Sequence, residues 1–137
     1  MVKKVRPYHS IESTLGYQFK NMELLKESLT HRSFANEKSR SNVSHNERLE
    51  FLGDAVLELA ISDLIMQRFP NYAEGDLSRL RASIVNETQL ADLAAHLDLG
   101  AMIFLGKGEE QTRGRNKSSI LANTYEAILA AVYLDGG

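Results

Sequence analysis

The chain has 137 residues, of which 43% are hydrophobic and 25% charged, and its formal net charge is −2. This length fits one domain, and the apolar fraction is too high for a disordered chain. The absence of cysteine excludes a disulfide scaffold, a thiolate metal site and a cysteine nucleophile. No apolar run approaches the roughly 20 residues that span a bilayer. We therefore expect a cytoplasmic protein without membrane contact, in which local basic patches hold any nucleic-acid partner.

Apolar residues recur mostly at three- and four-residue spacing, and no alternating segment rich in Val, Ile and Thr is present. This pattern predicts an all-α fold without a sheet. In chain order, the predicted helices span 10–15, a stretch from a cap at Asn21 to Leu29, 46–69, 74–85, 88–97 and 118–134. Two segments, 36–44 and 106–117, are predicted to be polar loops.

An acidic stripe on the third predicted helix is the most informative feature of the chain. Glu50 and Asp54 are four residues apart, so at about 3.6 residues per turn both carboxylates lie on one face of the helix. Glu47 extends the stripe by a turn. The rest of this helix is apolar almost all round, which is typical of a central, buried helix. Buried carboxylates need a partner, and either a divalent cation or a basic side chain such as Arg48 would serve; the alternative is a solvated acidic face.

A second pair of polar residues lies in the last predicted helix. Asn123 and Glu126 are three residues apart and interrupt an otherwise apolar run. They therefore share a face and, within a core segment, require polar partners. If this face packs against Glu50 and Asp54, four oxygen-bearing side chains converge. Such hard oxygen ligands suit Mg²⁺ or Mn²⁺ and not zinc.

The run Asn46-Glu47-Arg48-Leu49-Glu50-Phe51-Leu52-Gly53-Asp54 resembles the signature of the ribonuclease III family nearly residue for residue. Further blocks that resemble the family lie at 29–33, 69–70, 74–78 and 119–122. The resemblance implies one nuclease domain over residues 1–137, built as a multi-helix bundle around the central acidic signature helix. We do not expect this chain to contain the further helix and separate double-stranded-RNA-binding domain with which bacterial members of the family usually continue.

The resemblance also implies a function. It implies a homodimeric endoribonuclease that hydrolyses double-stranded RNA in rRNA and mRNA processing and leaves 5′-phosphate and 3′-hydroxyl ends. The implied cofactor is Mg²⁺, with Mn²⁺ as a substitute, and no small-molecule cofactor is expected.

Carried over position by position, the resemblance implies roles for individual side chains. The implied metal ligands are Glu50, Asp54, Asn123 and Glu126, the implied catalytic acids are Asp54, Glu126, Glu47 and Glu74, and Phe51 is implied to enter a pocket on the partner subunit. The family most often has Asp where this chain has Asn123. The amide still offers an oxygen ligand, but one negative charge is lost, so we expect weaker metal binding than with four acids.

Basic residues lie in the predicted loop that leads to the last helix. These residues are Lys107, Arg113, Arg115 and Lys117. Duplex RNA is recognised mainly through its shape, its 2′-hydroxyls and its phosphates. We therefore expect these side chains to contact RNA, with a solvated surface turn as the alternative.

Other side chains are expected to be structural. We expect His31 to form a structural hydrogen bond, His45 to lie near the N-cap of the signature helix, and Arg79 and Arg81 to form salt bridges. The expected core residues include Leu52, Val56, Leu121, Ile128 and Val132.

Two other functions are weighed against this one. A di-iron or di-manganese carboxylate bundle also uses acids on facing helices, but it needs Glu-x-x-His pairs. No His stands three residues after a Glu in this chain. A catalytically weak or inactive module that binds or assembles on double-stranded RNA is the stronger rival. The presence of Glu50, Asp54 and Glu126 opposes it, whereas Asn123 favours it.

Overall fold

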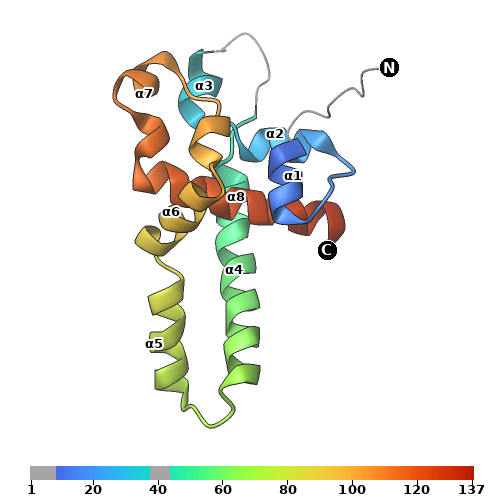
Figure 1. Ribbon diagram of the computed structural model, residues 1–137, viewed down its shortest axis with the longest axis vertical. Helices are drawn as coiled ribbons and strands as arrows, with labels where there is room; N and C mark the ends of the chain where they lie inside the picture. The colour runs from blue at the N-terminus through green and yellow to red at the C-terminus, as the bar shows by residue number, and fades with distance from the viewer. Residues whose placement is uncertain (1–8, 38–43) are drawn as a thin grey trace.

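Eight α-helices and two short 3-10 helices make up the part of the chain that the computed structural model describes, residues 9–37 and 44–137 (Figure 1). In chain order they are α1 (His9–Leu15), α2 (Met22–Ser28), α3 (Arg32–Glu37), α4 (Glu47–Arg68), α5 (Glu74–Ile84), α6 (Glu87–His96), η1 (Leu99–Met102), α7 (Lys107–Gln111), η2 (Gly114–Asn116) and α8 (Ser118–Gly136). The only β pairing among these residues is an isolated bridge between Thr30 and Phe104. The predicted all-α class is confirmed.

The six predicted helices are present, and each begins and ends within two residues of the expected bounds. Local chemistry explains several of these ends. The side chain of Asn21 accepts a hydrogen bond from the backbone N–H of Glu23, and Asn86 caps α6 in the same way. Pro70 follows Phe69, the residue that caps the C-terminal end of α4, and a proline disfavours helical backbone at the residue before it.

The two predicted polar loops were partly wrong, because short helices lie within them. Helix α7 and η2 occupy most of 106–117, and the end of α3 occupies the start of 36–44, of which residues 38–43 lie outside the described residues. Contacts between distant segments hold these short helices. The N–H of Gly106 donates to Ser33 Oγ (2.8 Å), and the N–H of Lys107 donates to a carboxylate oxygen of Glu37 (2.7 Å).

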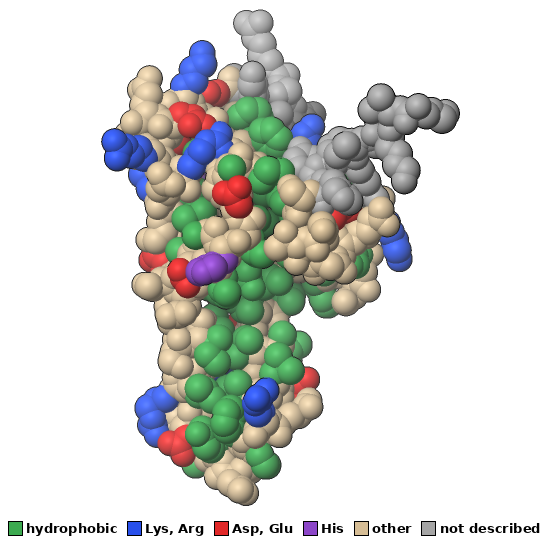
Figure 2. Space-filling model, viewed as in Figure 1, with side chains coloured by type: hydrophobic (Ala, Val, Ile, Leu, Met, Phe, Trp, Pro, Cys, Tyr) green, Lys and Arg blue, Asp and Glu red, His purple; other side chains and the backbone are tan. Residues whose placement is uncertain are grey.

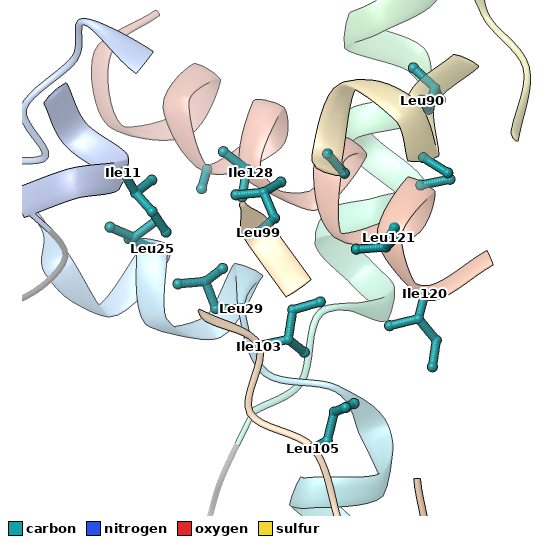
Figure 3. Close-up of a cluster of buried hydrophobic side chains, with 14 of the residues drawn as sticks. Ile11, Leu25, Leu29, Leu90, Leu99, Ile103, Leu105, Ile120, Leu121 and Ile128 are labelled. Atoms are coloured by element: carbon teal, nitrogen blue, oxygen red, sulfur yellow. The ribbon is translucent and has the colours of Figure 1, made fainter. Parts of the chain in front are cut away.

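The hydrophobic core lies where α1, α2, α6 and α8 meet the segment that follows α6. Figure 3 shows side chains from these elements converging, among them Leu25, Leu29, Leu99, Ile103 and Ile128, all nearly or completely inaccessible to solvent. Helix α8 contributes more buried residues than any other described helix and packs mainly on α4 and α6. The core therefore centres on α8.

The expectation that the signature helix is a central, buried helix holds only in part, because four of its residues are buried and much of its apolar surface is not. Leu121 and Ile128 of α8 are buried as predicted, but Leu52 and Val56 of α4, like Val132 of α8, are only half-buried. Periodicity reports that a helix is apolar, but it does not report how much of its surface the chain itself covers.

The C-terminal half of α4 extends away from the core and pairs with α5 to form an arm (Figure 1). Helix α5 has no fully buried residue. Hydrophobic side chains gather over this arm on the face shown in Figure 2. In the part of the chain that the structure describes, no helix combines the length and apolarity that crossing a membrane requires.

Candidate active site

The two predicted polar pairs lie where α4 and α8 cross. Gly53 is buried at this crossing, and a Cβ atom added to it would lie 1.8 Å from the carbonyl oxygen of Glu126. The two backbones are therefore in direct contact. Because Glu50 and Asp54 flank Gly53 on α4, the crossing brings both of them beside Glu126, as the sequence predicts.

The titration of the carboxylates reflects this crowding. Burial, the charges of Asp54 and Glu50, a side-chain hydrogen bond with Asp54 and the charge of Glu58 together raise the pKa of Glu126 from 4.5 to about 7. Burial, with the charges of Glu47 and Asp54, also raises the pKa of Glu50. At neutral pH the cluster therefore carries repulsion that either a proton or a cation relieves.

The donor atoms at the crossing fit a hard divalent cation. Glu50, Asp54 and Glu126 offer carboxylate oxygens, and half-buried Asn123 offers an amide oxygen one turn before Glu126. Within residues 9–37 and 44–137, no three His, Cys, Asp or Glu side chains already surround one point at ligand spacing. The fit therefore rests on the chemistry and proximity of the donors, and Glu126, whose pKa is raised by burial and the neighbouring acids, must lose its proton to hold a cation.

Glu47 lies one turn before Glu50, at the start of α4. Its carboxylate lies 3.5 Å from a guanidinium nitrogen of Arg32 on α3, and both side chains are largely exposed. The Glu47 N–H donates to Nδ1 of His45 (3.4 Å), which confirms that His45 lies near the N-cap of the helix. Arg48, the expected basic partner, is exposed and has no ion pair with any residue that the structure describes.

The connection between α2 and α3 holds this end of α4. Asn46 is buried, its N–H donates to the carbonyl of Thr30 (2.9 Å), and its Nδ2 donates to the carbonyl of Ser28 (3.0 Å).

Nδ1 of His31 accepts from the N–H of Ser33 (3.1 Å), which confirms the predicted structural role of this histidine. Burial is the main cause that lowers the pKa of His31, so the neutral imidazole that this bond requires predominates at neutral pH.

Glu74 is the predicted site residue that the crossing does not include. It begins α5 at the outer end of the arm, where it lines a hollow with Met66 and accepts a hydrogen bond from Ser78 Oγ (2.9 Å). Met66 lies twelve residues beyond Asp54 on α4, which corresponds to about 18 Å along the helix axis. Within one chain, Glu74 is therefore too far away to touch a metal held by Asp54.

Two of the four basic residues expected to contact RNA have partners inside the chain. Arg115 donates to two backbone carbonyls in the segment 100–103 and pairs with Glu110. Lys117 pairs with Glu109 at 3.0 Å. These contacts within the chain indicate a structural role for both side chains.

The other two basic residues, Lys107 and Arg113, are exposed and have no ion pair within the described part of the chain. Lys and Arg side chains gather at the end of the molecule that carries α7 (Figure 2). The predicted contact with RNA therefore rests mainly on Lys107 and Arg113. Arg79 pairs with Asp76 as predicted (2.5 Å), whereas Arg81 donates to Ser62 Oγ (2.9 Å).

A second, apolar surface on α4 begins beside its acidic stripe, where Glu47 and Phe51 border the same hollow. Phe51 is 82% exposed and Leu59 is 73% exposed, although both are large and apolar. They border two hollows of about 620 and 550 Å³. We define the apolar face as Phe51, Leu52, Val56, Leu59, Tyr133 and Leu134. Exposed apolar surfaces of this kind are typical of sites that bind another protein, a membrane or a ligand.

A family model described as Ribonuclease-III-like matches residues 21–137. The chain belongs to the ribonuclease III family. It is 52% identical over 128 residues to ribonuclease 3 of Syntrophobacter fumaroxidans, covering 93% of this chain and 53% of that protein. It is 53% identical over 128 residues to ribonuclease 3 of Geobacter metallireducens, covering 93% of this chain and 52% of that protein. The chain thus spans about half the length of these curated relatives.

Solved structures confirm the ribonuclease III fold. The nuclease domain of ribonuclease III from Campylobacter jejuni has 44% sequence identity and a TM-score of 0.87, with 95% of this chain and 87% of that chain covered. That structure is described for flexibility in the region involved in dimer formation. A second structure of the same domain also gives a TM-score of 0.87, with 43% identity, 97% of this chain and 86% of that chain.

Sequence reasoning missed two charged residues near the carboxylate cluster. Glu58 follows Asp54 by four residues and adds to the negative potential at Glu126. Extending the four-residue spacing by one more turn identifies it. Arg32 lies in another helix, and no spacing rule connects it to Glu47.

Proposed function

We propose that this chain is a metal-dependent endoribonuclease domain that hydrolyses phosphodiester bonds of double-stranded RNA in RNA processing and leaves 5′-phosphate and 3′-hydroxyl ends. The observation that carries the proposal is the contact between Gly53 and Glu126, which brings together acids from two helices that lie far apart in the sequence. The naming of relatives as ribonuclease 3 supports it. The presence of Glu50, Asp54 and Glu126 argues against a module that only binds RNA.

The chain's own residues would divide the work at this site. Glu50, Asp54, Asn123 and Glu126 would hold Mg²⁺, with Mn²⁺ as a substitute, through oxygen ligands. When bound, the cation would lower the pKa of the attacking water and stabilise charge on the phosphoryl oxygens. Glu47 would orient solvent at the edge of the site while Arg32 limits its movement. None of these roles requires a nucleophilic side chain.

We further propose that the apolar face joins two copies of this chain. Phe51 is a large side chain left almost entirely in solvent, and it borders a hollow of about 620 Å³ that also includes Leu24, Leu52 and Leu134. In a two-fold symmetric dimer, each Phe51 would fill the partner's copy of this hollow. The homologous Campylobacter jejuni domain, which has a region involved in dimer formation, supports this arrangement.

The test is cleavage of a labelled RNA duplex in Mg²⁺ and in chelator. We expect the duplex to be cut only with the cation, and Glu126→Gln to abolish cutting while duplex binding persists. Glu23→Gln, an exposed acid at the start of α2, is the matched control and should cut normally. Binding without cleavage by the unsubstituted chain at high Mg²⁺ would overturn the proposal in favour of an RNA-binding module.

A further inference from the structure

Arg115 joins several segments of the chain just before α8 begins. One guanidinium nitrogen donates both to the carbonyl of Gly100 (2.9 Å) and to the carbonyl of Ile103 (2.6 Å). The other terminal nitrogen pairs with Glu110 on α7. A guanidinium is a rigid, planar fork of donors, so one side chain fixes η1, the segment after it and α7 relative to each other.

The backbone of Arg115 is packed as tightly as its side chain. A Cβ atom on Gly100 would lie 2.6 Å from the carbonyl oxygen of Arg115 and 3.5 Å from Cδ2 of Leu121. Leu121 is buried in the first turns of α8, and its N–H donates to the carbonyl of Lys117 (3.0 Å). The 3-10 helix η1 is therefore wedged against both Arg115 and the beginning of α8.

Helix α8 is held at two further places. The contact between Gly53 and Glu126 holds its middle. Near its C-terminal end, the carboxylate of Asp135 accepts from Tyr17 Oη (2.7 Å) and from the N–H groups of Lys20 (2.8 Å) and of the next residue, Asn21 (2.9 Å).

Asn123 lies between the Arg115 attachment and the crossing at Gly53. Of the four candidate ligands, it is therefore the one whose position depends most directly on how the start of α8 is held.

We propose that Arg115 is a positioning residue of the active site, which fixes the start of α8 and thereby sets Asn123 and Glu126 against Glu50 and Asp54. This inference rests on the proposed function, and it assigns Arg115 a role other than contact with RNA. Lys117 does not substitute for it, because a single, partly exposed ion pair with Glu109 contributes little on its own.

The experiment compares Arg115→Ala and Arg115→Lys with the unsubstituted chain. For Arg115→Ala we expect the Mg²⁺ concentration at half-maximal cleavage to rise about tenfold, as for loss of residues that orient metal ligands. Duplex affinity in chelator should stay within twofold, and the backbone amides of Leu121 and Asn123 should exchange hydrogen faster in the metal-free protein. Arg115→Lys should give intermediate values, because an ammonium can bind a carbonyl but lacks the fork.

Lys26→Ala is the control, since Lys26 is exposed on α2 and belongs to neither the site nor the proposed RNA contact. It should leave all three measurements unchanged. A loss of duplex affinity in Arg115→Ala, with unchanged metal dependence and amide exchange, would overturn the inference and make Arg115 an RNA contact. If the alanine variant does not fold, Arg115→Lys decides: faster exchange supports the inference, and unchanged exchange overturns it.

The measurements also separate this inference from the function on which it rests. If the unsubstituted chain cuts no RNA, the proposed function fails. Amide exchange in the metal-free protein still decides whether Arg115 holds the start of α8, because that readout requires no catalysis.

Discussion

The backbones of Gly53 and Glu126 touch, so that a methyl group on Gly53 would lie 1.8 Å from the Glu126 carbonyl oxygen. This contact sets the separation of α4 and α8. It is also the reason that Asp54 meets an acid 72 positions later in the chain.

Replacing Gly53 with alanine should disrupt the candidate site and destabilise the fold. The added methyl group cannot be accommodated without moving one helix, and overpacking of this kind costs about 3 kcal/mol. Urea denaturation should show this loss in the free energy of unfolding, together with loss of cleavage. Gly108→Ala is the control, because a Cβ there meets no atom within 4 Å. Normal stability of Gly53→Ala would contradict the described contact.

The metal-free protein should lose stability as the pH rises from about 4.5 to about 7. The folded chain holds the proton of Glu126 with a pKa of about 7, above its ordinary value of 4.5, so protonation favours the folded state. The stabilisation from this proton is complete below pH 4.5, the ordinary pKa, and it is lost as the pH rises through about 7, the pKa in the folded chain. We expect the free energy of unfolding to fall by roughly 2 kcal/mol over this pH range, after allowing for solvent screening at this half-buried site.

Glu126→Gln should show a smaller dependence, because glutamine does not titrate, whereas Glu50, whose pKa is also raised, still does. The measurement is the free energy of unfolding in chelator across this pH range for both proteins. Parallel curves would show that Glu126 is not the responsible group.

Asn123→Asp should lower the Mg²⁺ concentration needed for half-maximal cleavage. A fourth carboxylate strengthens the attraction for a divalent cation, because affinity at such sites follows ligand charge. Titration of cleavage with Mg²⁺ provides the measurement, and Asn71→Asp, at an exposed position beyond α4, is the control. An unchanged curve would mean that Asn123 does not bind the metal.

Phe51→Ala should weaken the proposed dimer. Truncation of a central aromatic residue at a protein interface commonly costs about 2 kcal/mol or more, which corresponds to at least a roughly thirtyfold higher dissociation constant. Sedimentation over a range of concentrations measures it. Leu93→Ala, which removes an exposed leucine outside the apolar face, should leave the dissociation constant unchanged. The same dissociation constant for Phe51→Ala and the unsubstituted chain would rule out this face.

Asp135→Asn should lower the melting temperature at neutral pH. The hydrogen bonds from Lys20 N–H and Tyr17 Oη hold the pKa of Asp135 below its ordinary value of 3.8, so its carboxylate stabilises the fold above that value. The stabilisation disappears as the pH falls through the lower, folded pKa. Melting curves of both proteins should therefore differ at neutral pH and converge in acid. A constant difference would contradict the role of the charge.

The long helices could be predicted from the sequence because apolar spacing repeats over several turns. Helices α4 and α8 have 22 and 19 residues, and both were located within two residues. Helices α3 and α7 have six and five residues, too few for a pattern to repeat. They form because atoms such as Ser33 Oγ and the Gly106 N–H meet across the fold.

The candidate site could be predicted from the sequence only in part, for a related reason. Spacing pairs Glu50 with Asp54 and Asn123 with Glu126, but the sequence shows Gly53 only as a glycine within a helix. Arg115 stands in a polar, basic stretch, which indicates RNA contact, while the carbonyls that engage it belong to a segment with no charge pattern. Apolar periodicity likewise did not distinguish core residues from Phe51, which this chain leaves uncovered.

The arm has a consequence for how the molecule resists proteases. Helix α5 buries no side chain completely and packs mainly against α4, so little tertiary structure must open to release it. Limited digestion of the isolated chain should therefore nick the turn at 69–73 well before the helices around α8 are cut. A ligand or a neighbouring subunit that covers the arm would slow the cleavage of this turn.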